Sequence, residues 1–168
     1  SVAVLEKPGR PEPRAYWTLQ YRPDERITTA EAEEEARRLT HQAIALRLRA
    51  DVPVSMRLSG GIDSNVVAGV AAAVHAYPVH TFSIVEEDER YNETANIRLA
   101  LERLGCAHTL VPVPKHGNFE RLRDLCFYFD APVITITYLL QAVLSEEIRK
   151  AGFKVALGGT GADELFTG

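Results

Sequence analysis

Residues 58–64, Leu58-Ser59-Gly60-Gly61-Ile62-Asp63-Ser64, join a branched apolar run to a stretch of small residues, Asn65 to Val74. The two adjacent glycines let the backbone turn tightly and approach a ligand closely. The two serines add hydroxyl groups, and a helix that follows would present free N–H groups and the positive end of its dipole. A strand-to-helix turn with these features is suited to binding phosphate groups.

Asp63 is the unusual member of this turn, because a carboxylate in a phosphate site repels the ligand unless a cation lies between them. We therefore predict that Asp63 binds Mg²⁺ facing the pyrophosphate of a nucleotide. The alternative is a plain strand-to-helix turn in which a serine or an aspartate caps the helix.

A second glycine-rich stretch, Gly158-Gly159-Thr160-Gly161-Ala162-Asp163-Glu164, follows a predicted strand at residues 154–157. The first stretch follows a predicted strand at residues 54–58. If these two parallel strands are neighbours, both turns border one crevice at the carboxyl ends of the strands. Asp63 and Asp163 would then share Mg²⁺, and the paired glycines would let the backbone approach the nucleotide. Taken alone, the second stretch is equally consistent with a glycine-rich turn and a helix cap.

Strand-like and helix-like segments alternate along the chain. This alternation predicts an α/β fold, a doubly wound parallel sheet with helices on both faces. Residues 1–26, rich in proline, are expected to form an extended lead-in or linker, and residues 27–168 the domain. The predicted strands are 54–58, 79–85, 107–113 and 154–157, and the predicted helices are 28–49, 65–76, 92–104, 119–130 and 137–151.

Arg57 does not suit a central strand. Alternation places Val54, Met56 and Leu58 on one face of the sheet and Arg57 on the other. Its side chain is predicted either to reach the end of the strand and solvent or to meet an acidic partner.

The composition limits the class of protein. The 168 residues are 46% hydrophobic and carry a formal net charge of -4, as expected for one globular domain without a basic nucleic-acid surface. We expect no membrane span, because no apolar run is long enough. The two cysteines, Cys106 and Cys126, show no metal-binding spacing and are expected to be reduced. A cytoplasmic location is the resulting expectation.

The motifs resemble those of a known group of enzymes. Ser59 to Ser64 is similar to the pyrophosphate loop of the N-type ATP pyrophosphatases (the PP-loop superfamily), which have an adenine nucleotide alpha hydrolase-like fold. Three further stretches narrow the resemblance to the synthetase domain of glutamine-hydrolysing asparagine synthetases. These are Gly161-Ala162-Asp163-Glu164-Leu165-Phe166, Asp51-Val52-Pro53-Val54 and Thr81-Phe82-Ser83-Ile84. Tyr16-Trp17 and Tyr21-Arg22-Pro23 resemble the entry into that domain.

The resemblance implies a reaction and a set of site residues. ATP would adenylate the side-chain carboxylate of aspartate with release of pyrophosphate, and ammonia would then attack the acyl-adenylate to give asparagine and AMP. ATP and Mg²⁺ are the implied cosubstrate and cofactor. Asp63 and Asp163 would bind the metal, and no catalytic residue is assigned, although Thr160 would lie near the acyl chemistry. The implied ATP-binding residues are Leu58, Ser59, Gly60, Gly61, Asp63, Ser64, Ile84 and Gly159.

The chain departs from the family pattern in three ways. It lacks the glutaminase domain that begins with a nucleophilic cysteine, so a separate domain is expected to deliver ammonia from glutamine in the intact protein. It stops four residues after Glu164, so we expect a truncated domain that is inactive as a synthetase by itself. The face that the rest of the domain would cover is expected to be exposed and to allow self-association, for example as a homodimer. Thr160 replaces a typical glutamate, and Ala131 stands where a glutamate is common.

These departures leave the acceptor open. One alternative is a related amidotransferase or β-lactam-synthetase-like enzyme that acts on another carboxylate, which Thr160 favours. A second alternative is a nucleotide-binding module without catalytic activity, although the presence of both Asp63 and Asp163 argues against it.

Overall fold

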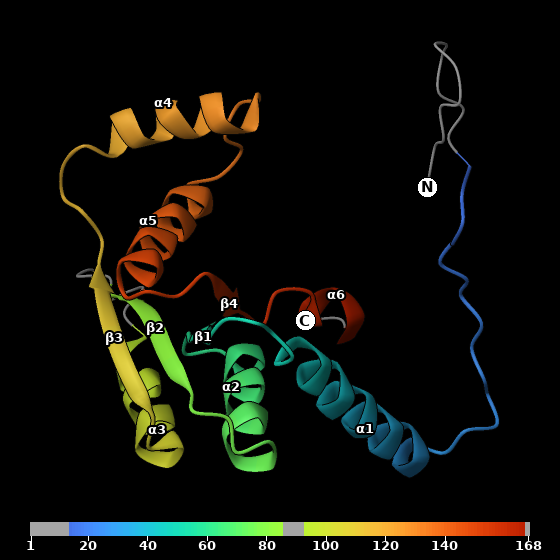
Figure 1. Cartoon of the computed structure of the whole chain (residues 1–168). Helices are drawn as coiled ribbons and strands as arrows, with labels where there is room; N and C mark the ends of the chain where they lie inside the picture. The colour runs from blue at the N-terminus through green and yellow to red at the C-terminus, as the bar shows by residue number, and fades with distance from the viewer. Residues whose placement is uncertain (1–13, 86–92, 167–168) are drawn as a thin grey trace. The chain divides into compact units, whose positions relative to one another are not determined.

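Figure 1 shows the computed structural model of the chain, which describes residues 14–85 and 93–166. The chain divides into two compact units, residues 1–36 and 37–168, which are described separately. Helix α1 is Thr29–Arg47. At its start the N–H of Glu31 donates to Thr28 Oγ1 (3.3 Å), and the N–H of Thr28 donates to Glu31 Oε2 (2.9 Å). This reciprocal pair is the capping box that the Thr28 to Glu31 spacing predicts.

The second unit is built around a parallel sheet of four strands in the order β3-β2-β1-β4. The strands are β1 (Val54–Arg57), β2 (His80–Val85), β3 (Ala107–Pro112) and β4 (Val155–Leu157). The order reverses after β3, because the chain returns past β2 and β1 to add β4 beside β1. The sheet therefore has its topological switch point between β1 and β4, where open α/β sheets bind ligands.

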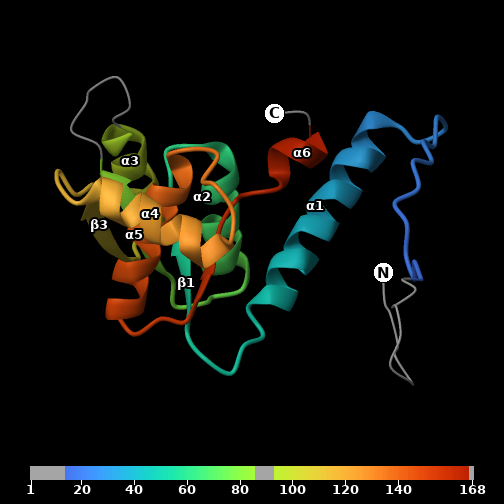
Figure 2. The ribbon, with the colours of Figure 1, turned by 90° about the horizontal axis from the view of Figure 1, so that it is seen from above.

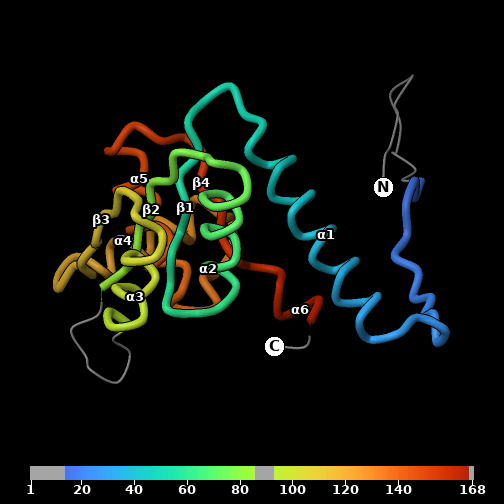
Figure 3. Tube along the Cα trace, turned by 90° about the horizontal axis from the view of Figure 1, so that it is seen from below, coloured from blue at the N-terminus to red at the C-terminus, as the bar shows by residue number. Residues whose placement is uncertain are grey.

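Helices cover both faces of this sheet, as predicted (Figures 1, 2 and 3). On one face, a core cluster joins Met56 and Leu58 to helices α2 and α3 and to Ile44 of α1. On the other face, Phe82 and Val111 pack against helix α5, with Leu122 of α4 at the margin. The helices are α2 (Ile62–Gly69), η1 (Val70–Val74), α3 (Thr94–Leu104), α4 (Asn118–Phe129), α5 (Thr137–Lys150) and α6 (Ala162–Phe166).

Two helices differ from the prediction. Helix α2 begins at Ile62, inside the glycine turn, with Gly61 in an extended conformation as its N-cap residue. It then closes with the short π-helical segment η1. The short helix α6 was not predicted, since one turn and a half is too short to show a hydrophobic period. The sequence also predicts a charged loop at residues 86–90, which lies outside the described residues, as does the first residue of the helix predicted at 92–104.

The described part of the chain has no helix that is both long and apolar enough to cross a membrane.

Buried serine side chains in the strands form hydrogen bonds with backbone carbonyl groups of the neighbouring segments. Ser55 Oγ donates to the carbonyl of Val155 (3.0 Å) across the junction of β1 and β4.

His108 on β3 is a partly buried titratable side chain. Its Nδ1 lies 2.7 Å from Thr81 Oγ1, and its Nε2 is buried with no hydrogen-bond partner among the described residues. Burial lowers the pKa of His108, so the folded state favours the neutral ring. The stability from this effect is complete above the unfolded pKa of about 6.5 and is lost as the pH falls below it.

We therefore expect the free energy of unfolding to decrease between about pH 7.5 and about pH 5.5, and His108→Gln to flatten that decrease. Urea denaturation followed by circular dichroism at each pH measures it. His116→Gln, at an exposed position, is the matched control. Equal pH slopes in both variants would contradict this role for His108.

Candidate nucleotide-binding cleft

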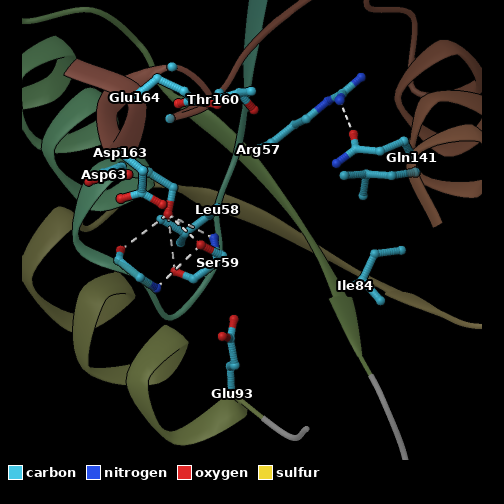
Figure 4. A pocket seen from close by; sticks show the side chains of 16 residues that line it. Arg57, Leu58, Ser59, Asp63, Ile84, Glu93, Gln141, Thr160, Asp163 and Glu164 are labelled. Atoms are coloured by element: carbon cyan, nitrogen blue, oxygen red, sulfur yellow. Dashed lines mark hydrogen bonds between the residues drawn. The ribbon is translucent and has the colours of Figure 1, made fainter. Parts of the chain in front are cut away.

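The two glycine-rich stretches meet at one cleft, as predicted for turns that follow neighbouring parallel strands. Strand β4 pairs with β1 in parallel, with Ser55 opposite Ala156 and Met56 opposite Leu157. A cleft of about 490 Å³ opens at the carboxyl ends of these strands (Figure 4). Its lining comprises Arg57, Leu58, Ser59, Gly61, Asp63, Ser64, Ile84, Glu93, Gln141, Leu144, Gly158, Gly159, Thr160, Gly161, Asp163 and Glu164.

Neighbouring strands hold the start of the first turn in place. The N–H of Leu58 donates to the carbonyl of Phe82 (2.9 Å), and Ser83 Oγ donates to the carbonyl of Leu58 (2.6 Å). Both groups of the Leu58 backbone are therefore bonded to β2. This fixes the point at which the chain leaves β1 and enters the turn.

The buried hydroxyl of Ser64 organises the turn itself. The N–H of Ser59 donates to Ser64 Oγ (3.0 Å), and the two serine hydroxyls lie 2.8 Å apart. Asn65 Nδ2 donates to the carbonyl of Gly61 (2.6 Å) and to that of Ser59 (3.1 Å). These bonds orient the turn before any ligand binds, and they identify Asn65 as a supporting residue that sequence reasoning did not single out.

Gly159 explains how the two turns meet. A Cβ atom on Gly159 would lie 2.6 Å from the Cβ of Asp63 and 2.7 Å from the backbone N of Ser64. Only a residue without a side chain allows this approach. The sequence-based interpretation placed Gly159 against the nucleotide, whereas the structure shows that it also contacts the first turn directly.

Glu93 is a cleft residue that sequence reasoning missed. Its Oε2 accepts a hydrogen bond from the N–H of Gly60 at 2.7 Å. Gly60 itself is absent from the lining of the cleft, although it is one of the predicted ATP-binding residues. Glu93 therefore holds a turn N–H that a phosphate oxygen could otherwise accept from. Glu93 follows β2 in the chain, and only the tertiary structure shows that it lies beside the turn.

The two predicted metal ligands come from different elements and line the same cleft. Asp63 lies in the first turn of α2, and Asp163 lies in the first turn of α6. The described residues contain no group of three or more histidine, cysteine, aspartate or glutamate side chains placed to hold a metal ion. Two carboxylates that line one cleft suit Mg²⁺, which commonly binds through one or two carboxylates, substrate phosphates and water.

This arrangement defines an α/β protein of the adenine nucleotide alpha hydrolase-like (PP-loop) fold. The NH3-dependent NAD synthetase of Campylobacter jejuni has a similar fold, with a TM-score of 0.52 and 15% identity, over 79% of this chain and 58% of that chain. The family model for asparagine synthase matches residues 35–168. The chain belongs to the asparagine synthase family.

Relatives in this family carry different names. The chain is 32% identical to the amidase chyE of Penicillium rubens, over 98% of this chain and 27% of that protein. It is 29% identical to asparagine synthetase [glutamine-hydrolyzing] 1 of Bacillus subtilis, over 92% of this chain and 24% of that protein. The chain thus spans about a quarter of the length of these curated relatives.

Proposed function

We propose that the chain provides the ATP-binding cleft of an enzyme that forms an amide from a carboxylate, ATP and ammonia. The observation that carries this proposal is the junction of the two glycine turns at Gly159 and Asp63, which places both family motifs in one cleft. The membership of the asparagine synthase family supports it.

Different residues would bind different parts of the nucleotide. Ser59, Gly60, Gly61 and Ser64 would bind the pyrophosphate, and Leu58 and Ile84 would flank the adenine. Asp63 and Asp163 would hold Mg²⁺, which would neutralise the charge on the pyrophosphate as it leaves. A phosphate oxygen would replace the carboxylate of Glu93 as the acceptor of the hydrogen bond from the N–H of Gly60. The turns thus supply alignment and charge compensation rather than proton transfer.

The acceptor carboxylate is proposed from two observations. Aspartate is one candidate, because of the similarity to asparagine synthetase 1 of Bacillus subtilis. Another carboxylate is the second candidate, because Thr160 lines the cleft and because an amidase is among the relatives. In the intact protein, ammonia would come from glutamine through a separate glutaminase domain.

The deciding experiment is pyrophosphate release by the protein made from its full gene, with Mg²⁺-ATP, ammonia and a panel of carboxylates. Release that depends on aspartate and yields asparagine supports asparagine synthesis. Release with another carboxylate alone supports the second candidate. Tight ATP binding with no release for any carboxylate would support a non-catalytic nucleotide-binding module instead.

We also propose that this chain is the first part of a larger synthetase domain, preceded by a lead-in over residues 1–26. The support comes from α4, whose described residues include none that is buried. Phe127 and Tyr128 on this helix are 77% and 82% exposed. Exposed aromatic surface of this kind is normally covered in a stable protein.

A further inference from the structure

Arg57 is the last residue of β1, and its side chain crosses to the face of the sheet covered by α5. Nη1 donates to Gln141 Oε1, and Nη2 donates to Ser145 Oγ at 3.1 Å. Gln141 and Ser145 lie one helical turn apart on α5, so they hold the guanidinium in one orientation. Figure 4 shows the side chain extending from the strand toward Gln141 at the edge of the cleft.

The positive charge of Arg57 has no counterion within residues 14–85 and 93–166, which rules out a described acidic partner of the kind anticipated from its place in a strand. Its Nε is buried and lacks a hydrogen-bond partner among those residues. Partial burial disfavours the charge of the guanidinium and so lowers its pKa. A half-buried charge that is hydrogen-bonded only to neutral groups is costly unless an anion completes the site.

The carboxylates that line the described part of the cleft form no ion pair with Arg57. Among the described lining residues Arg57 is the only cation, and the carboxylates are Asp63, Glu93, Asp163 and Glu164. Helix α2 lies on the opposite face of the sheet, beside Met56 and Leu58. The side chain of Arg57 therefore leaves β1 on the face opposite to the helix that follows the first turn.

The surroundings of Arg57 belong to the second turn. A Cβ atom on Gly158 would lie 3.9 Å from the Cδ of Arg57, and Thr160 follows two residues later in the same cleft wall. Thr160 is the cleft residue that the proposed function links to the acceptor carboxylate. The space between Arg57, Gly158 and Thr160 therefore adjoins the proposed acceptor region.

We propose that Arg57 is a specificity-determining residue that binds an anionic group of the acceptor, a carboxylate other than the one that is amidated. This inference rests on the proposed function. Gln141 and Ser145 act as positioning residues, because they orient the guanidinium toward that carboxylate. A planar guanidinium binds a carboxylate through paired hydrogen bonds, which lysine cannot reproduce.

The test compares acceptors that differ by one carboxylate: L-aspartate with β-alanine, and succinate with propionate. The protein made from the full gene is titrated by calorimetry with each compound in the presence of Mg²⁺ and a non-hydrolysable ATP analogue. We expect at least one dicarboxylate to bind about 10- to 100-fold more tightly than its partner. Arg57→Gln should remove this preference, and Arg57→Lys should restore only part of it.

Two measurements keep the result interpretable. The dissociation constant of the ATP analogue should change less than about twofold in Arg57→Gln, which also shows that the variant is folded. Arg98→Gln, an exposed arginine on α3, is the matched control and should keep the dicarboxylate preference. If Arg57→Gln does not fold, Gln141→Leu should weaken dicarboxylate binding by disturbing the guanidinium.

The outcomes separate the two proposals. A dicarboxylate preference that survives Arg57→Gln, or the absence of any preference in the unmodified protein, overturns the role of Arg57. Weakened binding of the ATP analogue by Arg57→Gln also overturns it, and assigns the arginine to a phosphate instead. Failure of the unmodified protein to bind the ATP analogue overturns the proposed function.

Discussion

Gly159→Ala is expected to disrupt the cleft, because the new methyl group has no space. Its carbon would lie 2.6 Å from the Cβ of Asp63, 2.7 Å from the N of Ser64 and 2.8 Å from the backbone carbon of Asp63. Two of these three atoms are backbone atoms, which cannot rotate away. Overpacking of this kind costs about 1–3 kcal/mol of stability. If ATP binds at the junction, we expect its affinity to fall by at least about 100-fold.

The neighbouring glycine provides the control for this prediction. A Cβ atom on Gly158 would have only ordinary contacts, 3.9 Å and 4.0 Å from two carbons of Arg57. Gly158→Ala should therefore unfold at nearly the same urea concentration as the unmodified chain. Urea denaturation and calorimetry with an ATP analogue should be carried out on both variants. Similar stabilities for the two would show that the turns do not meet as closely as described.

Asp63→Asn is expected to abolish binding of ATP that depends on Mg²⁺. The substitution keeps the shape of the side chain and removes only the charge that is proposed to hold the metal. Loss of an outer-shell partner commonly lowers metal affinity by about 10- to 100-fold, so loss of a direct ligand should cost at least about 100-fold. Stability should fall by less than about 1 kcal/mol, since Asp63 lies at the positive end of α2.

Metal removal distinguishes this role from a purely structural one. In the unmodified protein, chelation of Mg²⁺ should weaken ATP binding to the level of Asp63→Asn, and chelation should have no further effect on the variant. Asp124→Asn, on the exposed surface of α4, is the control for loss of one negative charge. An Asp63→Asn variant that binds Mg²⁺-ATP normally would show that this aspartate has only a structural role in the first turn of α2.

Much of the fold could be predicted from local patterns. The capping box at Thr28 and Glu31 marked the start of α1 within one residue, and Gly105, with φ of 58°, ends α3 as a glycine in the left-handed region should. Alternating strands and helices predicted the parallel sheet, because each pattern reports which side of its own segment is buried. The boundaries of α2 and the presence of α6 were missed, because both depend on how a glycine turn continues into hydrogen bonding.

The candidate site divides in the same way. The spacing of Ser59, Gly60, Gly61, Asp63 and Ser64 indicates a phosphate-binding turn, since the required chemistry lies within one short stretch. The contact of Glu93 with Gly60 joins residues 33 positions apart, and that of Arg57 with Gln141 joins residues 84 positions apart. Neither contact leaves a pattern in the sequence, because each depends on the order of strands in the sheet.

The amino-acid sequence by itself determined the type of fold, the family and the two turns, because these follow from local residue chemistry and from short motifs. Only the tertiary structure decided that Gly159 touches Asp63, that Glu93 holds Gly60 and that Arg57 meets neutral partners on α5. The physical reason is the strand order β3-β2-β1-β4, which places both β2 and β4 beside β1 and brings segments that are distant in the sequence to one edge of the sheet.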